Sequence, residues 1–490
     1  RSLAFALAKA ATHMNFKMIL NILGWILIFE ALFFLVPIIT AVVYGEAVLA
    51  DFLISAGLCL ICGGLLIMKK PENKALYSRE GYVIVSLSWI VLSLFGALPF
   101  YISGVIPNFV DALFETVSGF TTTGATVLGE VETLPKAILI WRSFTHWVGG
   151  MGVLVFIMAF VPLSGGQNMH IMKAESPGPS VSKLVPRVKT TAMILYSIYF
   201  VLTFAEFIVL LIGGMRVFDA LNTSFSTAGT GGFGFRNDSF ASFSPALQII
   251  VTVFMLIFSI NFSSYYLLIT GKLKEVFNSE LKVFALIVIS AITVITLNIR
   301  HLFPSVGDAL RNASFTVASI VSTTGFSTAD FDMWPELSRT IIVLIMFIGA
   351  CAGSTGGGIK VSRIIILFKS MAKELSVMIH PKQVRKITVD SHAIDHETVR
   401  SVNVYMVCYI MVFVISMGVM SFDNYDLITN FTAVAATLNN VGPGLEMVGP
   451  IQNFGFMSSP TKLILIFDML AGRLELFPML LLFAPATWKK

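Results

Sequence analysis

Long apolar runs recur from near the beginning of this chain to its end, and no other feature constrains the fold as strongly. A hydrocarbon core about 30 Å thick is crossed by about 20 apolar residues in a helix. Apolar residues make up 56% of the 490 residues and charged residues only 12%, which is not the composition of a soluble globular protein. We therefore expect an all-α polytopic membrane protein with roughly ten crossings. The expected spans are 18–43, 48–68, 82–104, 137–162, 191–214, 245–270, 281–299, 338–368, 401–421 and 461–485.

The basic residues predict the orientation, because Lys and Arg resist translocation. They gather in alternate loops, which we expect to face the cytoplasm together with both termini. This topology also explains the small net charge of +5, so no nucleic-acid partner is expected. The basic residues are Lys69, Lys70, Lys74 and Arg79; Lys173, Lys183, Arg187 and Lys189; Lys272, Lys274 and Lys282; Lys369, Lys373, Lys382, Arg385, Lys386 and Arg400; and Lys489 and Lys490.

The connections on the other side carry few basic residues, and each contains a semi-polar stretch too short to cross a bilayer. A short apolar helix followed by Thr, Ser, Asn and Gly is typical of a re-entrant loop. Irregular backbone survives at membrane depth only where protein packs it or where it lines a cavity. A pore or binding site is therefore predicted at the stretches 111–124, 219–232, 308–325 and 426–442.

The four stretches align on one glycine each, at a spacing suited to a repeated module of helix, pore loop and helix. Each copy opens with an Asp, which we expect to cap its short helix. Ordinary turn chemistry would explain the Gly and Thr content of a single stretch, but four phased copies favour a repeat. The aligned glycines are Gly124, Gly232, Gly325 and Gly442.

Four extended backbones that converge on an axis can replace the water shell of an alkali cation with rings of carbonyl oxygens. Glycine permits the backbone angles needed, and the negative ends of the short helices favour a cation. The four segments contain no ring of carboxylates, which argues against selection of divalent ions. The candidate filter residues are Thr121, Thr122, Thr123 and Gly124; Gly229, Thr230, Gly231 and Gly232; Ser322, Thr323, Thr324 and Gly325; and Asn439, Asn440, Val441 and Gly442.

A glycine-rich run at 349–358 interrupts the span 338–368. Each glycine costs a helix about 1 kcal/mol relative to alanine, and a helix broken at mid-membrane usually lines a cavity. The glycines would also suit a close helix-packing surface. The run lacks the adjacent Gly-Lys-Ser/Thr of a phosphate loop, so no nucleotide site is expected on this chain.

Several charged residues lie within apolar spans, where insertion costs about 2.5–3.5 kcal/mol each. Arg473 lies near Asp468 and Glu475 in the last span. It would act either as an electrostatic barrier to permeation or as a member of a structural ion pair. Arg142 and His146 lie near the outer end of another span, where snorkelling or support of a pore helix is expected.

Five motifs resemble those of the Trk/Ktr/HKT superfamily of potassium transporters. Two spans precede the first repeat, as in the bacterial TrkH type of that superfamily. The motifs are Gly-Phe-Thr-Thr-Thr-Gly-Ala-Thr at 119–126, Trp-Arg-Ser-Phe-Thr-His-Trp-Val-Gly-Gly-Met-Gly at 141–152, Ser-Thr-Gly-Gly-Gly-Ile-Lys at 354–360, Asn-Asn-Val-Gly-Pro-Gly at 439–444 and Gly-Arg-Leu-Glu-Leu-Phe-Pro at 472–478.

The resemblance implies four helix–pore loop–helix repeats around one pseudo-fourfold pore, plus an extra N-terminal helix pair. The implied function is potassium uptake across the cell membrane, with potassium bound at the filter residues. The second and fourth copies depart from the glycine-and-hydroxyl pattern of the first, so the ring is chemically uneven. The implied parts are the N-terminal pair (1–70) and repeats 71–175, 176–275, 276–385 and 386–490.

The resemblance also implies a movable gating loop below the filter, in the second helix of the third repeat. It implies no cofactor on this chain, a homodimer in membrane lipid, and a cytosolic, TrkA-like ring of nucleotide-binding regulatory subunits docked on the basic loops, which include 165–190 and 369–400. The location would be a bacterial inner membrane. The gate residues would be Gly353, Ser354, Thr355, Gly356, Gly357, Gly358, Lys360 and Arg473.

A coupled transporter and an enzyme are the two other classes of function. An alternating-access transporter coupled to sodium or protons also uses broken helices at the bilayer midplane, although its repeats are typically inverted and these are parallel. An enzyme is not expected, because the sequence shows no metal-ligand cluster, no nucleophile paired with a base and no phosphate loop.

Overall fold

The computed structural model describes residues 14–68, 71, 76–152, 188–381, 386–390 and 392–488. Within these ranges the regular secondary structure is helical apart from one ribbon of two short strands, β1 (Thr388–Val389) and β2 (His392–Ala393). Six helices are long and apolar enough to cross a membrane, and a bent pair makes up to seven. This confirms an all-helical multi-span membrane protein. Of the ten expected spans, 137–162, 338–368 and 461–485 do not contain such a helix within the described residues. The seven candidate spans are Phe16–Tyr44, Leu49–Met68, Ser78–Ile102, Thr190–Ile212, Ser279–Leu302, His396–Asp423 and the pair Pro245–Phe258 with Phe262–Ile269.

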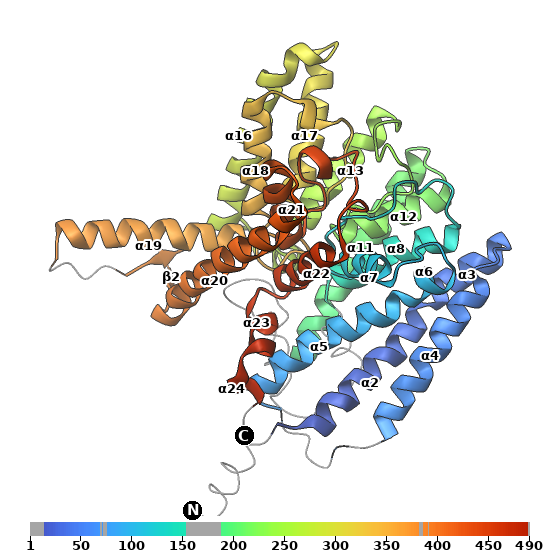
Figure 1. The fold of residues 1–490 in the computed structure, drawn as a ribbon. Coiled ribbons are helices and arrows are strands. Elements are labelled where there is room, and N and C mark those ends of the chain that lie inside the picture. Colours follow the sequence, from blue (N-terminus) through green and yellow to red (C-terminus); the bar gives the residue numbers. More distant parts are fainter. Residues whose placement is uncertain are drawn as a thin grey trace, which may run out of the picture.

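A helical hairpin precedes the remainder of the fold. It consists of α2 (Phe16–Phe33) continued by α3 (Leu35–Tyr44), and of α4 (Leu49–Met68). Two facing glycines bring the backbones together, because a Cβ on Gly24 or Gly63 would lie 2.8 Å from the other's carbonyl oxygen. Small residues permit this close approach between helices in lipid. The hairpin lies at one flank of the molecule and packs against α5 (Figure 1).

Four long helices or helix pairs each lead into a short helix at the predicted positions. The short helices have 12, 12, 16 and 12 residues, or about 18–24 Å at 1.5 Å per residue, too short to cross the core. The long elements are α5 (Ser78–Gly96) with α6 (Leu98–Ile102), α11 (Val188–Ile212), α16 (Ser279–Ile299) and α20 (His396–Met420), and the short ones, which we call pore helices, are α7 (Phe109–Phe120), α12 (Val217–Ala228), α17 (Val306–Val321) and α21 (Leu427–Leu438).

The helix after the pore loop breaks in the second, third and fourth repeats, whereas the sequence predicts a break only within 338–368. The spans 245–270 and 461–485 are therefore not continuous helices. A 90° bend follows α13 because Asn261 caps the next helix, and Glu475 and Leu476 adopt positive φ after α22. The part of span 137–162 beyond residue 152 lies outside the described residues. The segments are α8 (Lys136–Gly150); α13 (Pro245–Phe258) and α14 (Phe262–Ile269); α18 (Glu336–Ile348) and α19 (Val361–Ile379); and α22 (Ser459–Arg473) and α23 (Phe477–Phe483).

These post-loop helices arrange the pore helices in a closed circuit. α8 packs against α7 and α12, α13 against α12 and α17, α18 against α17 and α21, and α22 against α21 and α7. Each therefore lies between its own pore helix and the next one in the chain, and the last returns to the first.

The expected aspartate caps are only partly present. Asp426 caps α21 by accepting from the Thr429 amide, but the caps of α7, α12 and α17 are Asn108, Arg216 and Ser305. In those three helices the aspartate lies in the first turn instead. A carboxylate is also stabilised there, because the free amides and the positive end of the helix dipole are close.

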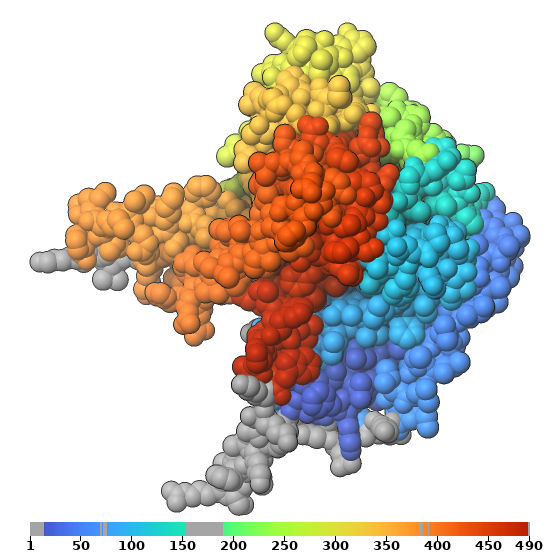
Figure 2. Space-filling view, in the orientation of Figure 1, coloured from blue at the N-terminus to red at the C-terminus, as the bar shows by residue number. Residues whose placement is uncertain are grey.

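Helix α19 projects away from the body of the molecule (Figures 1 and 2). Its exposed apolar residues include Phe368, Met371 and Leu375. The remaining short elements are α15 (Leu273–Val276), α24 (Pro485–Trp488), η1 (Arg300–Leu302), η2 (Phe331–Met333), η3 (Ser421–Asp423) and η4 (Glu446–Val448).

Candidate functional site

The four pore helices end in the same backbone motif. One residue past each helix is still right-handed, and the next has a φ between 54° and 60°. The amide after that bonds back to the helix at 2.8–2.9 Å, as in a Schellman motif. These bonds run from Thr123 to Ser118, Gly231 to Ser226, Thr324 to Ser319 and Val441 to Ala436. The left-handed residues are Thr122, Thr230, Thr323 and Asn440 rather than glycine.

The aligned glycine follows in each loop, and all four have a positive φ of 80° to 101°. A Cβ at any of them would come closer than 3.0 Å to a carbonyl oxygen of another loop, so glycine is required by contact as well as by angle. These contacts form a closed ring in chain order. Gly124 lies against the carbonyl oxygen of Gly231, Gly232 against that of Thr324, Gly325 against that of Val441, and Gly442 against that of Thr123.

The sixteen predicted filter residues are thus brought together around one point. Gly124, Gly232 and Gly325 are partly exposed and the other thirteen are buried. The four aligned glycines line one cavity of about 120 Å³ together with Arg142, Arg236, Asn237 and Asn453.

The side chains of the loops differ between copies. In the first and third copies, two hydroxyls contact each other, Thr121 with Thr123 at 2.8 Å and Ser322 with Thr324 at 2.6 Å. The second copy has Gly229 and Gly231 at those positions. In the fourth copy Asn440 reaches out of its own loop, and its Nδ2 donates to Thr123 Oγ1 at 3.0 Å and to the Met469 carbonyl at 2.9 Å.

A buried ion pair lies behind the first two loops. Arg142 Nε is 2.8 Å from Glu115 Oε1, and the two side chains are 2% and 0% exposed. Glu115 also accepts from the Thr126 hydroxyl and the Val127 amide, while Arg142 donates to the Gly234 carbonyl. Arg142 therefore contacts the pore helix α7 through Glu115 and the segment after the second filter glycine through Gly234. Glu115 lies within the short helix α7 and is not among the site residues predicted from the sequence. A carboxylate within an apolar stretch is the signal that indicates a buried partner.

The glycine-rich run forms an irregular loop between α18 and α19. Gly349, Gly353, Gly358 and Lys360 all have positive φ. The loop contacts the filter segments of the third and fourth copies, since the Gly357 amide donates to Thr323 Oγ1 at 2.6 Å and the Gly358 amide to the Asn439 carbonyl at 3.0 Å.

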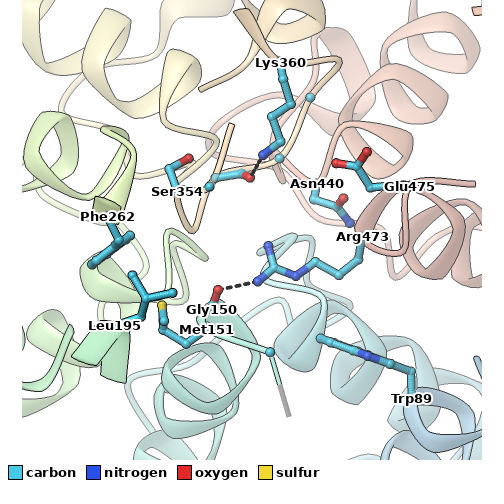
Figure 3. Close-up of a pocket in the computed structure, with 16 residues that line it drawn as sticks. Trp89, Gly150, Met151, Leu195, Phe262, Ser354, Lys360, Asn440, Arg473 and Glu475 are labelled. Atoms are coloured by element: carbon cyan, nitrogen blue, oxygen red, sulfur yellow. Dashed lines mark hydrogen bonds between the residues drawn. The ribbon is translucent and has the colours of Figure 1, made fainter. Parts of the chain in front are cut away.

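Arg473 extends from the end of α22 across the cavity toward this loop (Figure 3). Its guanidinium donates to the Thr355 carbonyl at 2.7 Å, to the Gly150 carbonyl at 2.6 Å and to the Gly149 carbonyl. It therefore links the loop to the end of α8. Lys360 Nζ donates to the Gly356 carbonyl within the loop itself.

Seven of the eight predicted gate residues line one cavity of about 90 Å³, with Trp89, Phe262 and Asn440 among the other lining residues. Thr355 does not line it; its hydroxyl donates to the Phe258 carbonyl. Near Arg473, Glu475 pairs with Arg363, and Asp468 accepts from the Ser416 hydroxyl. The lining gate residues are Gly353, Ser354, Gly356, Gly357, Gly358, Lys360 and Arg473.

Comparison with known proteins agrees with this architecture. Residues 48–490 match a family described as TrkH, cation transport protein. The Trk system potassium uptake protein TrkH of Salmonella typhimurium is 37% identical over 486 residues, 97% of this chain and 100% of the relative. The TrkG protein of the same system in Escherichia coli is 32% identical over 480 residues, 96% of this chain and 99% of the relative.

A solved structure is also similar. The crystal structure of the potassium transporter TrkH from Vibrio parahaemolyticus superimposes with a TM-score of 0.87 at 36% identity, covering 97% of this chain and 100% of that one. The resemblance drawn from the five sequence motifs is thereby confirmed.

Proposed function

Because the chain belongs to the TrkH family of cation transport proteins, we propose that it takes up potassium across the cell membrane through a filter built from the four pore loops. Backbone carbonyls of these loops would replace the water shell of the ion. The family is one of transporters, not of enzymes.

The closed ring of glycine contacts is the observation that carries this proposal. Each aligned glycine lies against the backbone of the next loop, and the fourth lies against the first. Four equivalent backbones around one point are the geometry that a carbonyl filter requires. The pore helices also direct their negative C-terminal ends at the loops, which favours a cation. The architecture we propose is four repeats, 71–175, 176–275, 276–385 and 386–490, around one pseudo-fourfold pore, with 1–70 as an added pair.

The glycine-rich loop is the proposed gate. It lies directly against the third and fourth filter segments, and Arg473 ties it to the end of α8. A guanidinium beside the conduction path also repels a cation. Arg473 thus supports the closed state in two ways, by holding the loop and by its charge.

The assembly we propose follows the family. The chain would lie in a bacterial inner membrane with both termini in the cytoplasm, as a homodimer. A cytosolic nucleotide-binding ring would dock on the basic loops, of which 369–400 is largely described and most of 165–190 lies outside the described residues.

Ion flux into liposomes that hold the purified chain tests the filter. Potassium and rubidium should enter faster than sodium, and Gly124→Ser should erode this difference because its side chain would displace the Gly231 carbonyl. Gly418→Ser is the matched control, since a Cβ added there would meet no atom within 4 Å outside the nearby backbone of its own helix. Equal sodium and potassium flux in the wild-type chain would contradict the proposal.

The same liposomes separate conduction from coupled transport. A filter conducts potassium down its own gradient, with no sodium or proton gradient present. Potassium accumulation that requires such a gradient would favour the alternating-access alternative.

A further inference from the structure

His146 lies on α8 at the joint between the first and second filter segments. Its Nδ1 is 2.7 Å from the carbonyl oxygen of Gly119, at the end of the first pore helix. Its Nε2 accepts from the amide of Phe233 at 3.2 Å, just after the second filter segment. The side chain is fully buried. One imidazole therefore bridges two segments that are more than 100 residues apart in the chain.

These two partners determine the protonation state of the ring. The Phe233 amide is a donor, so Nε2 must carry a lone pair, and the Gly119 carbonyl is an acceptor, so Nδ1 must carry the proton. Only the neutral Nδ1–H tautomer satisfies both. A protonated ring would lose the bond to Phe233, because both of its nitrogens are donors.

The second filter segment is shaped around this ring. A Cβ on Gly231 would come closer than 3.0 Å to the imidazole, and one on Gly229 would do the same with the His146 carbonyl. The hydroxyl pairs of the first and third copies have no counterpart in the second, and the imidazole occupies that space. The phenyl ring of Phe233 packs against the imidazole of His146, with ring centroids 4.3 Å apart. The guanidinium carbon of Arg142 lies 4.2 Å from the centroid of the Phe233 ring.

The joint between the fourth and first copies is built differently. Gly149 approaches the Phe120 carbonyl as Gly472 approaches that of Leu438, which places His146 and Met469 at equivalent positions, three residues before each glycine. At that joint, the polar link is supplied by Asn440 from the filter segment itself. None of the helices α13, α18 and α22 contains a histidine, so the imidazole is specific to the first joint.

We propose that His146 is a positioning residue for ion discrimination: its neutral imidazole holds the second filter segment, which has no hydroxyl pair of its own, at the spacing set by the first pore helix. This inference rests on the proposed potassium filter. The second filter segment, Gly229-Thr-Gly-Gly232, would then be positioned by a side chain of α8 rather than by a hydrogen bond between its own side chains.

The first test is the tautomer, which does not depend on transport. The full chain with ¹⁵N-labelled histidine in lipid should show one residue with a protonated Nδ1 and an unprotonated Nε2, and His146→Met should remove that signal from the set of seven histidines. An Nε2–H tautomer or a charged ring at this residue near neutral pH would overturn the link to Phe233.

The second test is the potassium-to-sodium flux ratio in liposomes. His146→Met places the residue of the fourth copy at this joint, and the ratio should fall about tenfold, equivalent to about 1.4 kcal/mol. His146→Gln should recover part of the ratio, because its amide oxygen can still accept from the Phe233 amide. Met469→Leu is the matched control and should leave the ratio unchanged.

A double variant separates positioning from space filling. Gly231→Ala collides with the imidazole, and His146→Ala removes the collision. If His146 only fills space, the double variant regains the wild-type ratio, and the proposal fails. If the two hydrogen bonds matter, the ratio stays low although the chain purifies at normal yield.

The proposed function and this inference can fail separately. If the wild-type chain does not discriminate potassium from sodium, the proposed function is wrong, and so is the role of His146 in selectivity. The ¹⁵N signals of the histidine would still show whether His146 makes its hydrogen bonds to Gly119 and Phe233. If the wild type discriminates and His146→Met does so equally well, only the inference is wrong.

Discussion

Arg142 and Glu115 show how a charged pair is accommodated at membrane depth. Both side chains are buried, and each has further partners: two protein donors on the carboxylate and a backbone carbonyl on the guanidinium. A buried charge is tolerated when it is paired and its remaining hydrogen-bonding groups are satisfied. The pair orders the segments that follow the first two filter glycines, at Thr126 and Gly234.

Removing one partner of this pair should be costly. Arg142→Met leaves the Glu115 carboxylate buried without a counter-charge and should destabilise the chain by about 3–5 kcal/mol. Unfolding of the purified variants in detergent measures this. The double variant Glu115→Gln/Arg142→Met should lose less than the sum of the two single variants, because no charge is left unpaired. Strict additivity would show that the two side chains do not interact.

At the scale of elements, the main departure from a simple bundle of spanning helices is the break in the helix that follows the pore loop, seen in the second, third and fourth repeats. Among the breaks within the described residues, that of the third repeat is the longest, from Gly349 to Lys360. Its loop contacts the filter segments through the amides of Gly357 and Gly358 and is joined to α22 by Arg473. Irregular backbone that lies directly against a filter is placed where a small rearrangement would open or close the path of the ion.

Gly357→Ala tests whether the loop closes the pore. The added methyl group would come closer than 3.0 Å to the Asn439 carbonyl and should push the loop away from the filter. Loss of one hydrogen bond worth about 1 kcal/mol shifts a closed–open equilibrium about fivefold, so potassium flux through the chain alone should rise by about that factor. Gly64→Ala should leave flux unchanged, because its added methyl group would meet no atom within 4 Å outside the nearby backbone of its own helix. Unchanged flux in both variants would argue against a gate here.

At the scale of the whole molecule, the fold depends on a seam between its first and last repeats. Lys462 on α22 donates to Asp111 on α7 at 2.7 Å, and the Phe454 amide donates to the Thr126 carbonyl at 2.8 Å. The lysine side chain is 4% exposed. These contacts join residues more than 300 positions apart, and they close the circuit of pore helices.

Lys462→Met should weaken the seam by about 1–3 kcal/mol, because the partly buried Asp111 carboxylate loses a charged hydrogen bond. The second repeat provides the control. Asp219 pairs there with Arg216, whose side chain is 80% exposed, so Arg216→Met should change stability by about 0.5 kcal/mol or less. Thermal unfolding of both variants in the same detergent gives the comparison. Equal losses would show that the seam pair is no more than a surface ion pair.

Local physics made much of this molecule predictable. Apolar runs long enough to cross a bilayer identify the spans, because insertion depends on the composition of each segment. The four short helices and their glycines were also predictable, since helix length and the tolerance for positive φ are local properties. The aspartate caps were less so, because a carboxylate is favoured at the cap and in the first turn alike.

The remaining features depend on residues that are distant in the chain. The order of the ring is set by which loop each glycine touches, so that Gly442 lies against Thr123. The hydrogen bonds of His146 to Gly119 and Phe233 form only when two filter segments already lie next to α8. Those of Arg473 likewise require the glycine-rich loop and the end of α8 to be in place. Residue types and spacing therefore predicted a membrane protein with four phased loops, whereas long-range packing chose which backbone atoms meet, because such contacts exist only once the helices have closed their circuit.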